Sequence, residues 1–268
     1  MRCSTNDFIK KYEPTPQFRW VRQIFNDIGN FTFMDLAANH PIHQSNTYAL
    51  EQLGWKGVCI DANTLCIKLL KKLRSCTVVN TVVSRKQEYV NFTYKGEMGG
   101  IVNKKYDNSD SNEVSSSIKA HSLQSLLKSL KLAKIDYLSL DVEGAEEDIL
   151  SEEFDWSDVF RAITIERPSP RLCQRLFRRG YLYAGSVGDA AFIHISHPQA
   201  LIVSKNETFK YPVAKCRNHN YRYKDRIPLK GDCKSIFGCC SFPGFPPDMY
   251  NYNMKSPRKI IEMQEAED

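Results

Sequence analysis

Acidic side chains crowd the end of an apolar run at residues 135–142, within the stretch IDYLSLDVEGAEED. Such a run is typical of a central parallel strand that is covered on both faces. Asp141 and Glu143 lie two positions apart, so on a strand their side chains point the same way. Two adjacent carboxyl groups can raise one pKa, which makes a candidate general base, and they could equally hold a divalent cation or sugar hydroxyls. Glu146 and Glu147 fit a helix start, where acids are favoured.

Acids also follow three other strand-like runs. Asp35 opens the motif DLAAN, Asp61 closes the run GVCID, and Glu166 closes ITIE. The carboxyl ends of parallel strands meet at one edge of a sheet, and ligands bind in open α/β sheets at that edge. We therefore expect these acids to line one site. For Glu166, a structural ion pair with Arg167 or Arg171 is the alternative.

Two of these motifs have the composition of a nucleoside-binding edge. An acid in the position of Asp61 accepts hydrogen bonds from the hydroxyls of a ribose, although Asp61 or Asn63 could instead cap the following helix. Small residues between Asp35 and Asn39, such as Ala37, let the chain approach a ligand closely. An ordinary strand-to-helix turn explains that loop equally well.

The elements that would position these residues alternate between strand and helix, which predicts an α/β fold with a parallel sheet. A further two strands are separated only by the short turn VGD, so they should pair antiparallel. The segment 95–117 predicts a loop of functional length. The expected strands are 31–38, 57–62, 77–84, 135–142, 161–166, 181–186 and 190–196, and the expected helices are 45–53, 64–74, 121–130 and 170–179.

The chain has 268 residues, which suits one α/β domain with additions. We expect an N-terminal helical extension at 1–30, the main domain at 31–200, and a partly disordered C-terminal extension at 201–268. Basic residues are scattered despite the net charge of +6, which disfavours nucleic acid as a partner. No apolar run is long enough to span a membrane and no secretory signal is evident, so a cytoplasmic location is expected.

Histidine and cysteine spacings do not predict a metal site. His40 and His43 lack two further ligands nearby, and four-ligand coordination is the rule for structural zinc. The cysteines of the tail lack a CxxC motif. These cysteines are Cys216, Cys233, Cys239 and Cys240.

Three segments together resemble the FkbM-type S-adenosylmethionine-dependent methyltransferases. They are FMDLAANHPIHQSNTYALEQLGWKGVCIDAN, IDYLSLDVEGAEEDIL, and ITIERP with the later GYLYAGSVGDAAFIHI. The resemblance implies a Rossmann-like class I fold, with a mostly parallel seven-stranded sheet that ends in a C-terminal antiparallel hairpin. It also implies S-adenosylmethionine as cofactor and methylation of an oxygen, often on a sugar or a glycosylated metabolite.

The resemblance also implies roles for single residues. Asp35 and Asn39 would lie beside the methionine part of the cofactor, and Asp61 would bind its ribose. Asp141 and Glu143 would face the methyl group and the acceptor as the catalytic pair. The residues expected to contact the cofactor are Asp35, Ala37, Asn39, Asp61, Ala62, Ser84 and Asp141, with Ser84 near the adenine.

We therefore expect an O-methyltransferase acting on a small-molecule acceptor such as a carbohydrate. A non-catalytic binding protein on the same fold is the alternative, because related sequences usually have glycine where Ala37 stands and again near Pro41. Proline removes an N–H group from the loop. An NAD-dependent oxidoreductase would need a GxGxxG loop, which is absent, and a nucleic-acid methyltransferase would need a basic face.

Overall fold

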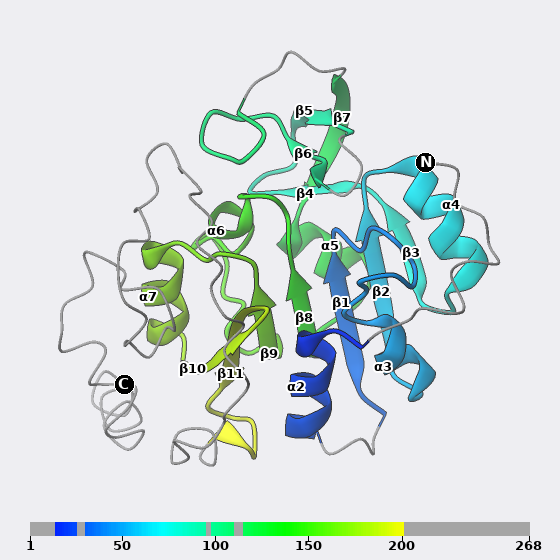
Figure 1. The fold of residues 1–268 in the computed structure, drawn as a ribbon. Helices are drawn as coiled ribbons and strands as arrows, with labels where there is room; N and C mark the ends of the chain where they lie inside the picture. The colour runs from blue at the N-terminus through cyan, green and yellow to red at the C-terminus, as the bar shows by residue number, and fades with distance from the viewer. Residues whose placement is uncertain (1–13, 26–29, 95–97, 110–114, 201–268) are drawn as a thin grey trace, which may run out of the picture.

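The computed structural model describes residues 14–25, 30–94, 98–109 and 115–200 (Figure 1). The main sheet has seven strands, in the order β10 (Tyr181–Val187), β11 (Asp189–His194), β9 (Phe160–Ile165), β8 (Ile135–Leu140), β1 (Thr32–Leu36), β2 (Lys56–Asp61) and β3 (Thr77–Asn80). The described helices are α2 (Pro16–Phe25), α3 (Tyr48–Gln52), α4 (Thr64–Leu73), α5 (Leu123–Ser129), α6 (Glu146–Ile149) and α7 (Pro170–Arg178).

The main sheet is mostly parallel. β3, β2, β1, β8 and β9 run in the same direction, whereas β11 pairs antiparallel with both β9 and β10. The predicted α/β class with a mostly parallel seven-stranded sheet is confirmed. The strand order reverses at β1, which lies between β2 and β8, and such a switch point opens a crevice at the carboxyl ends of the strands.

Helices cover both faces of this sheet, because successive strand residues point to opposite sides. Phe33 and Tyr137 pack with buried side chains of α2, α3 and α4 on one face. Met34 and Leu138 pack with those of α5 and α7 on the other face. The central strands are consequently buried along nearly their whole length, as their apolar runs predict.

The N-terminal helix belongs to this packing. Trp20 and Val21 of α2 have no exposed surface. The predicted apolar position at Ile28 and the predicted extension at 201–268 lie outside the described residues, and the domain boundaries at 30 and 200 stay predictions. None of the helices that the structure describes has both the length and the apolar character needed to traverse a bilayer.

A second, four-stranded sheet was not predicted. Its order is β4 (Val82–Ser84), β7 (Ser115–Ser122), β5 (Tyr89–Thr93) and β6 (Gly100–Ile101), and it lies beyond the carboxyl ends of β1 and β8 (Figure 1). The single strand expected at 77–84 was wrong, because the segment is two strands separated by Thr81. β3 pairs with β2 in the main sheet, whereas β4 pairs with β7 in the second sheet. The loop expected at 95–117 is correct at residues 102–109 and wrong where β6 and the first residues of β7 lie. These pairings join distant segments and leave no local periodic pattern.

Two predicted helices differ in detail. The leucines of α4 do not share one buried face, because Ile67 and Leu70 are buried, whereas Leu65 and Leu73 are 66% and 36% exposed. The helix expected from residue 45 begins at Tyr48, whose N–H donates to the Oγ of Ser45 at 3.1 Å. Thr47 is the N-cap of α3, so neither Ser45 nor Asn46 is the cap.

A buried guanidinium group fastens the loop after β1 to this framework. Arg74, with a side chain that is 0% exposed, donates to a carboxylate oxygen of Glu51 at 2.9 Å. It also donates to the carbonyl of Pro41 at 3.1 Å and to the Oγ1 of Thr47 at 3.1 Å. Thr47 in turn donates to Asp35 at 2.5 Å. One cation therefore links the end of α4, the helix α3 and the end of β1.

We expect Arg74→Met to lower the free energy of unfolding by about 3–5 kcal/mol, because the carboxylate of Glu51 would stay buried without its partner. Urea denaturation measures the difference. Arg85→Met is the matched control, since the side chains of Arg85 and Glu153 are 51% and 44% exposed and an exposed ion pair contributes only about 0–1 kcal/mol. Equal losses in the two variants would contradict the role given to Arg74.

Candidate functional site

A cavity of about 330 Å³ lies at the strand-order switch. Its floor is formed by the carboxyl ends of β1, β2 and β8 with the loops that follow them. Its opposite wall is formed by residues 81–83 and 98–101 and by Phe92 and Tyr94 of the second sheet region. The volume falls within the roughly 300–1,000 Å³ typical of small-molecule sites.

The first residues of the loop after β1 include two with positive φ angles, a conformation that favours glycine. Ala37 and Asn39 have φ angles of 61° and 47°, in the left-handed region. Left-handed φ costs a residue with a Cβ roughly 1–2 kcal/mol, and glycine escapes that cost. A glycine at the position of Ala37, which the resemblance implies, would fit this geometry, and here an alanine adopts it. Ala37 and Asn39 both line the cavity, and their contact with a cofactor stays a prediction.

Asp61 closes the loop as well as facing the cavity. One carboxylate oxygen accepts the N–H of Asn39 at 2.7 Å, and the other accepts the N–H of Asn63 at 2.7 Å. Asn63 is the N-cap of α4, so the capping alternative is correct for that residue. Burial raises the pKa of Asp61. The N–H of Ala62 is a third backbone donor to this carboxylate, which leaves one of its four lone-pair sites for a ligand. Ala62 also lines the cavity.

Asp35 is turned toward the protein interior. Its carboxylate is 4% exposed, accepts the hydroxyl of Thr47, and has its pKa raised by burial. Next to it, the side-chain amide of Asn46 donates to the Oγ of Ser139 at 3.1 Å. Asp35 still borders the cavity, but its main contact holds the loop that Arg74 anchors.

The turn after β8 is strained and clamped. Glu143 has a φ of 54° and Gly144 a φ of 103°. The buried carboxylate of Glu146 accepts the N–H of Gly144 at 3.1 Å and that of Val142 at 3.4 Å. Sequence reasoning treated Glu146 only as a helix-start acid, and its clamping role was missed. A non-glycine residue held in this backbone region persists only where its surroundings fix it.

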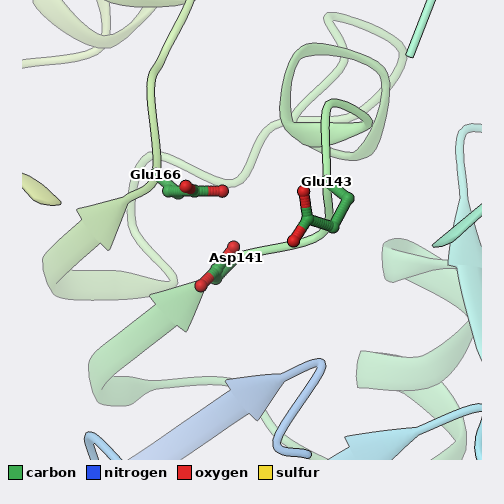
Figure 2. Close-up of side chains that lie close together, drawn as sticks. All are labelled: Asp141, Glu143 and Glu166. Atoms are coloured by element: carbon green, nitrogen blue, oxygen red, sulfur yellow. The ribbon is translucent and has the colours of Figure 1, made fainter. Parts of the chain in front are cut away.

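Three carboxyl groups converge beyond this turn. Figure 2 shows Asp141, Glu143 and Glu166 pointing toward one another, and their oxygens lie within 4.8 Å. Three such oxygens could ligate a divalent cation. Arg167 already supplies positive charge there, since its Nη2 lies 3.2 Å from Glu143 and 2.5 Å from Glu166. Arg167 also contacts Asp107, at 3.1 Å.

The crowding changes the protonation of this group. Burial, followed by a hydrogen bond and repulsion from Glu166, raises the pKa of Asp141 to about 10. Burial, followed by repulsion from Glu166, raises the pKa of Glu143 to about 7. The Oδ1 atom of Asp141 is buried and has no hydrogen-bond partner among the residues that the structure describes. Near pH 7, Asp141 is therefore protonated while Glu143 gains and loses its proton.

A fourth acid connects this group to the N-terminal helix. Burial raises the pKa of Asp189 to about 6, and repulsion from Glu166 adds to the effect. Gln17 of α2 donates to Asp189 at 2.7 Å. No local pattern indicates this contact, because 172 positions separate the two residues.

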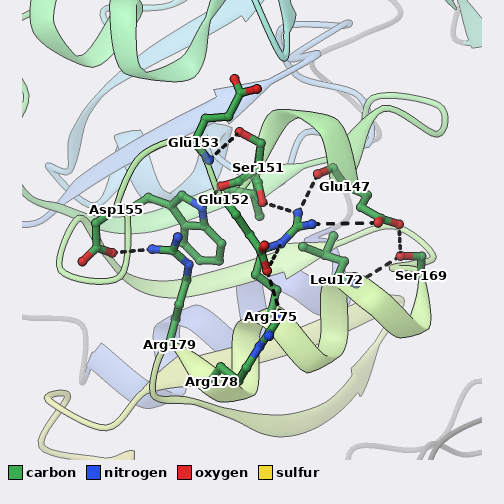
Figure 3. Close-up of polar contacts among 12 residues, drawn as sticks. Glu147, Ser151, Glu152, Glu153, Asp155, Ser169, Leu172, Arg175, Arg178 and Arg179 are labelled. Carbon is green, nitrogen blue, oxygen red and sulfur yellow. Dashed lines mark hydrogen bonds and ion pairs between the residues drawn. The ribbon is translucent and has the colours of Figure 1, made fainter. Parts of the chain in front are cut away.

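Helix α7 holds the far side of the clamped turn. Figure 3 shows Arg175 reaching back to α6, where it donates to the carbonyls of Glu147 at 2.8 Å and Leu150 at 2.6 Å. Ser169 donates to the carboxylate of Glu147 and caps α7 by accepting the N–H of Leu172 at 3.1 Å. Arg179 pairs with Asp155. The basic residues of α7 therefore serve intramolecular contacts, which leaves less of a basic face than the sequence allowed.

The structure brings most of the predicted residues together. The cavity lining includes all the predicted contacts except Ser84, namely Asp35, Ala37, Asn39, Asp61, Ala62, Asp141 and Glu143. Ser84 is buried and its hydroxyl donates to the carbonyl of Lys86, so Val82 and Val83 of β4 face the cavity instead. Sequence reasoning missed Phe92, Tyr94 and Met98, which the unpredicted sheet brings to the wall. Alternation of large side chains at Val90, Phe92 and Tyr94 was the available signal.

Comparison with known proteins agrees with this geometry. Residues 35–183, more than half of the chain, match the family model described as "Methyltransferase FkbM domain". No curated protein and no solved structure matches the chain. The matched segment begins at the acid that ends β1 and includes β8 and the clamped turn.

We expect Asp141→Asn to flatten the decline of stability with pH. The folded-state pKa of Asp141 is about 10, far above the roughly 3.9 of an unfolded chain. The folded state therefore binds the extra proton between these values, and wild-type stability falls as pH rises through that window. Between pH 5 and pH 9, the free energy of unfolding should therefore fall by less in the variant than in the wild type. The difference should exceed about 1 kcal/mol, since one pKa unit corresponds to about 1.4 kcal/mol.

Denaturant unfolding at each pH measures this effect. Glu152→Gln is the control, because Glu152 is 58% exposed and lies outside the carboxyl cluster. Its stability curve should run parallel to that of the wild type. A parallel curve for Asp141→Asn as well would show that the folded protein does not hold the proton on Asp141.

Proposed function

This chain belongs to the FkbM methyltransferase family, and we propose that it transfers a methyl group from S-adenosylmethionine to a hydroxyl of a small-molecule acceptor. A carbohydrate or a glycosylated metabolite is the acceptor class that we favour. The proposal combines the family match, the cavity at the strand-order switch and the acids that border it.

The charge of the cavity is the observation that carries the choice of cofactor. Four acids border it, and no lysine or arginine does so among the described residues. A dinucleotide cofactor brings a pyrophosphate, which favours backbone N–H groups at a helix N-terminus or positive charge. A sulfonium brings a positive charge, which the ionised members of this set would attract, whereas no cationic side chain of the described lining would repel it. The lining therefore supports S-adenosylmethionine over a nicotinamide cofactor. The lining acids are Asp35, Asp61, Asp141 and Glu143.

The residues present fit the parts of this cofactor. Asp61 accepts the backbone N–H groups of Asn39, Asn63 and Ala62, and the remaining lone-pair site of its carboxylate can accept a ribose hydroxyl. The apolar side chains of Val82 and Val83 offer a surface for the adenine, in place of the role first given to Ser84. Asp35 and Ala37 border the end where the amino-acid part would lie.

The two carboxyl groups after β8 have separate roles in our proposal. When bound, S-adenosylmethionine supplies an electrophilic methyl group on sulfur. Glu143, with a pKa of about 7, accepts the proton of the acceptor hydroxyl. Asp141, with a pKa of about 10, stays protonated and donates a hydrogen bond that orients the acceptor oxygen. Carboxyl groups whose pKa values are driven apart are typical of such divided roles, and holding the reactants in line supplies the proximity effect.

The departures that favoured a non-catalytic binding protein do not close the cavity. Ala37 adopts the backbone angle that a glycine would adopt, and the carbonyl of Pro41 accepts a hydrogen bond from Arg74. The loop therefore keeps its path without either glycine.

We expect Asp61→Ala to weaken the binding of S-adenosylmethionine by about 5- to 150-fold. Loss of hydrogen bonds to a charged group costs about 1–3 kcal/mol, and each 1.4 kcal/mol is tenfold in affinity. Equilibrium dialysis with radiolabelled S-adenosylmethionine measures the change. Asp155→Ala is the control, because this carboxylate is 77% exposed and does not line the cavity. Unchanged binding in Asp61→Ala would place the ribose elsewhere.

We expect Glu143→Gln to reduce methyl transfer by about 10²–10⁴-fold, the usual contribution of a general base, while cofactor affinity changes by no more than about threefold. The assay follows radiolabelled methyl groups from S-adenosylmethionine into a panel of sugars and glycosylated metabolites. In the wild type, kcat/KM should rise with pH through about 7, because Glu143 must lose its proton to act as the base.

The variant should lack that rise. Glu152→Gln, which changes an exposed acid outside the cavity, should behave like the wild type. Full transfer by Glu143→Gln would exclude Glu143 as the base. Absence of transfer to any hydroxylated acceptor by the wild type, despite cofactor binding, would favour the binding-protein alternative.

A further inference from the structure

Two cysteines that do not line the cavity lie side by side near its floor. Cys59 is in β2, and Cys76 directly precedes β3, the neighbouring parallel strand (Figure 1). The register pairs Cys59 with Val78, two positions after Cys76, so both cysteine side chains point to the same face. Their sulfur atoms are 2.7 Å apart, closer than the roughly 3.5–4.0 Å at which non-bonded heavy atoms attract best. We propose that Cys59 and Cys76 form a reversible disulfide.

The surroundings give the two sulfurs different roles. Cys59 has no exposed surface, whereas Cys76 is partly exposed. Its contact with Cys76, followed by burial, raises the pKa of the Cys59 thiol. Arg74 lies close enough to both sulfurs to attract negative charge on either. Since the attacking species in disulfide exchange is a thiolate that the oxidant can reach, Cys76 reacts first and Cys59 resolves.

Oxidised glutathione is an oxidant that balances the reaction. The Cys76 thiolate attacks one sulfur of the glutathione disulfide, and one glutathione thiolate leaves. The Cys59 sulfur, having given up its proton to solvent, attacks the mixed disulfide at Cys76, and the second glutathione leaves. The pair is oxidised by two electrons, and one glutathione disulfide is reduced to two glutathione molecules. An excess of reduced glutathione reverses both steps.

The new bond would tie together segments that frame the cavity. It would join β2, which ends in Asp61, to the segment that carries Arg74 and Ser75, whose N–H donates to Glu51 at 2.7 Å. The two cysteines are 17 positions apart. Closing a loop of this length restricts the unfolded chain, so the oxidised protein should melt at a temperature higher by roughly 5 °C.

The test uses the full-length protein, reduced and freed of reductant, then incubated with oxidised glutathione at defined ratios to the reduced form. Unreacted thiols are alkylated, and the digested protein is analysed by mass spectrometry without reduction. We expect a peptide pair linked through Cys59 and Cys76, two hydrogens lighter than the separate peptides, which dithiothreitol separates. Cys173→Ser should keep this link, because Cys173 is buried in the other core cluster.

Cys76→Ser should lose both the linked peptide and the rise in melting temperature. Recovery of Cys59 and Cys76 both alkylated after oxidation would overturn the proposal. A mixed disulfide that remains on Cys76, or a link from Cys59 to another cysteine, would overturn it too. The mapping of the wild-type protein decides the question even where the variant does not fold.

Discussion

The buried guanidinium of Arg74 is the interaction on which the cavity floor depends. Arg74 follows α4, and its partners come from the loop after β1 and from α3; they include the carbonyl of Pro41 and the carboxylate of Glu51. A cation with no exposed side-chain surface is tolerable only when its hydrogen bonds are satisfied and its charge is paired. These contacts hold the loop between β1 and α3 in one conformation. Thr47 accepts a hydrogen bond from Arg74 and donates one to Asp35, so it connects Arg74 to the end of β1.

The acids at the sheet edge serve two different purposes. Asp61 and Glu146 accept backbone N–H groups and hold turns whose residues have positive φ angles. Asp141 and Glu143 hold no such turn among the described residues, and burial and repulsion from Glu166 raise their pKa values. Asp61 and Glu146 therefore hold the backbone conformation of the turns, and Asp141 and Glu143 supply ionisable groups with raised pKa values. A rigid turn that carries an acid of raised pKa is a common arrangement in catalytic sites.

The sequence predicted the main sheet well because its strands are buried and apolar, and because acids end four of them. The same local pattern could not distinguish a clamp from a reactive acid, since Asp61 and Glu146 differ from Asp141 only in what contacts them in space. The second sheet was missed because β4 and β7 pair across a long sequence separation. That omission removed Phe92 and Tyr94 from the predicted site and assigned to Ser84 a position that Val82 and Val83 occupy. The buried side of α4 could not be identified from leucine spacing, because leucines also occur on its exposed side.

We propose that the acid-lined cavity at the switch between β1 and β8 binds the adenosyl cofactor of a methyltransferase. Calorimetric titration of the folded protein with S-adenosylhomocysteine and with S-adenosylmethionine measures this binding directly. We expect saturable binding of both at one site, with micromolar dissociation constants. Absence of binding heat for both at several temperatures, in a sample that unfolds cooperatively, would contradict it.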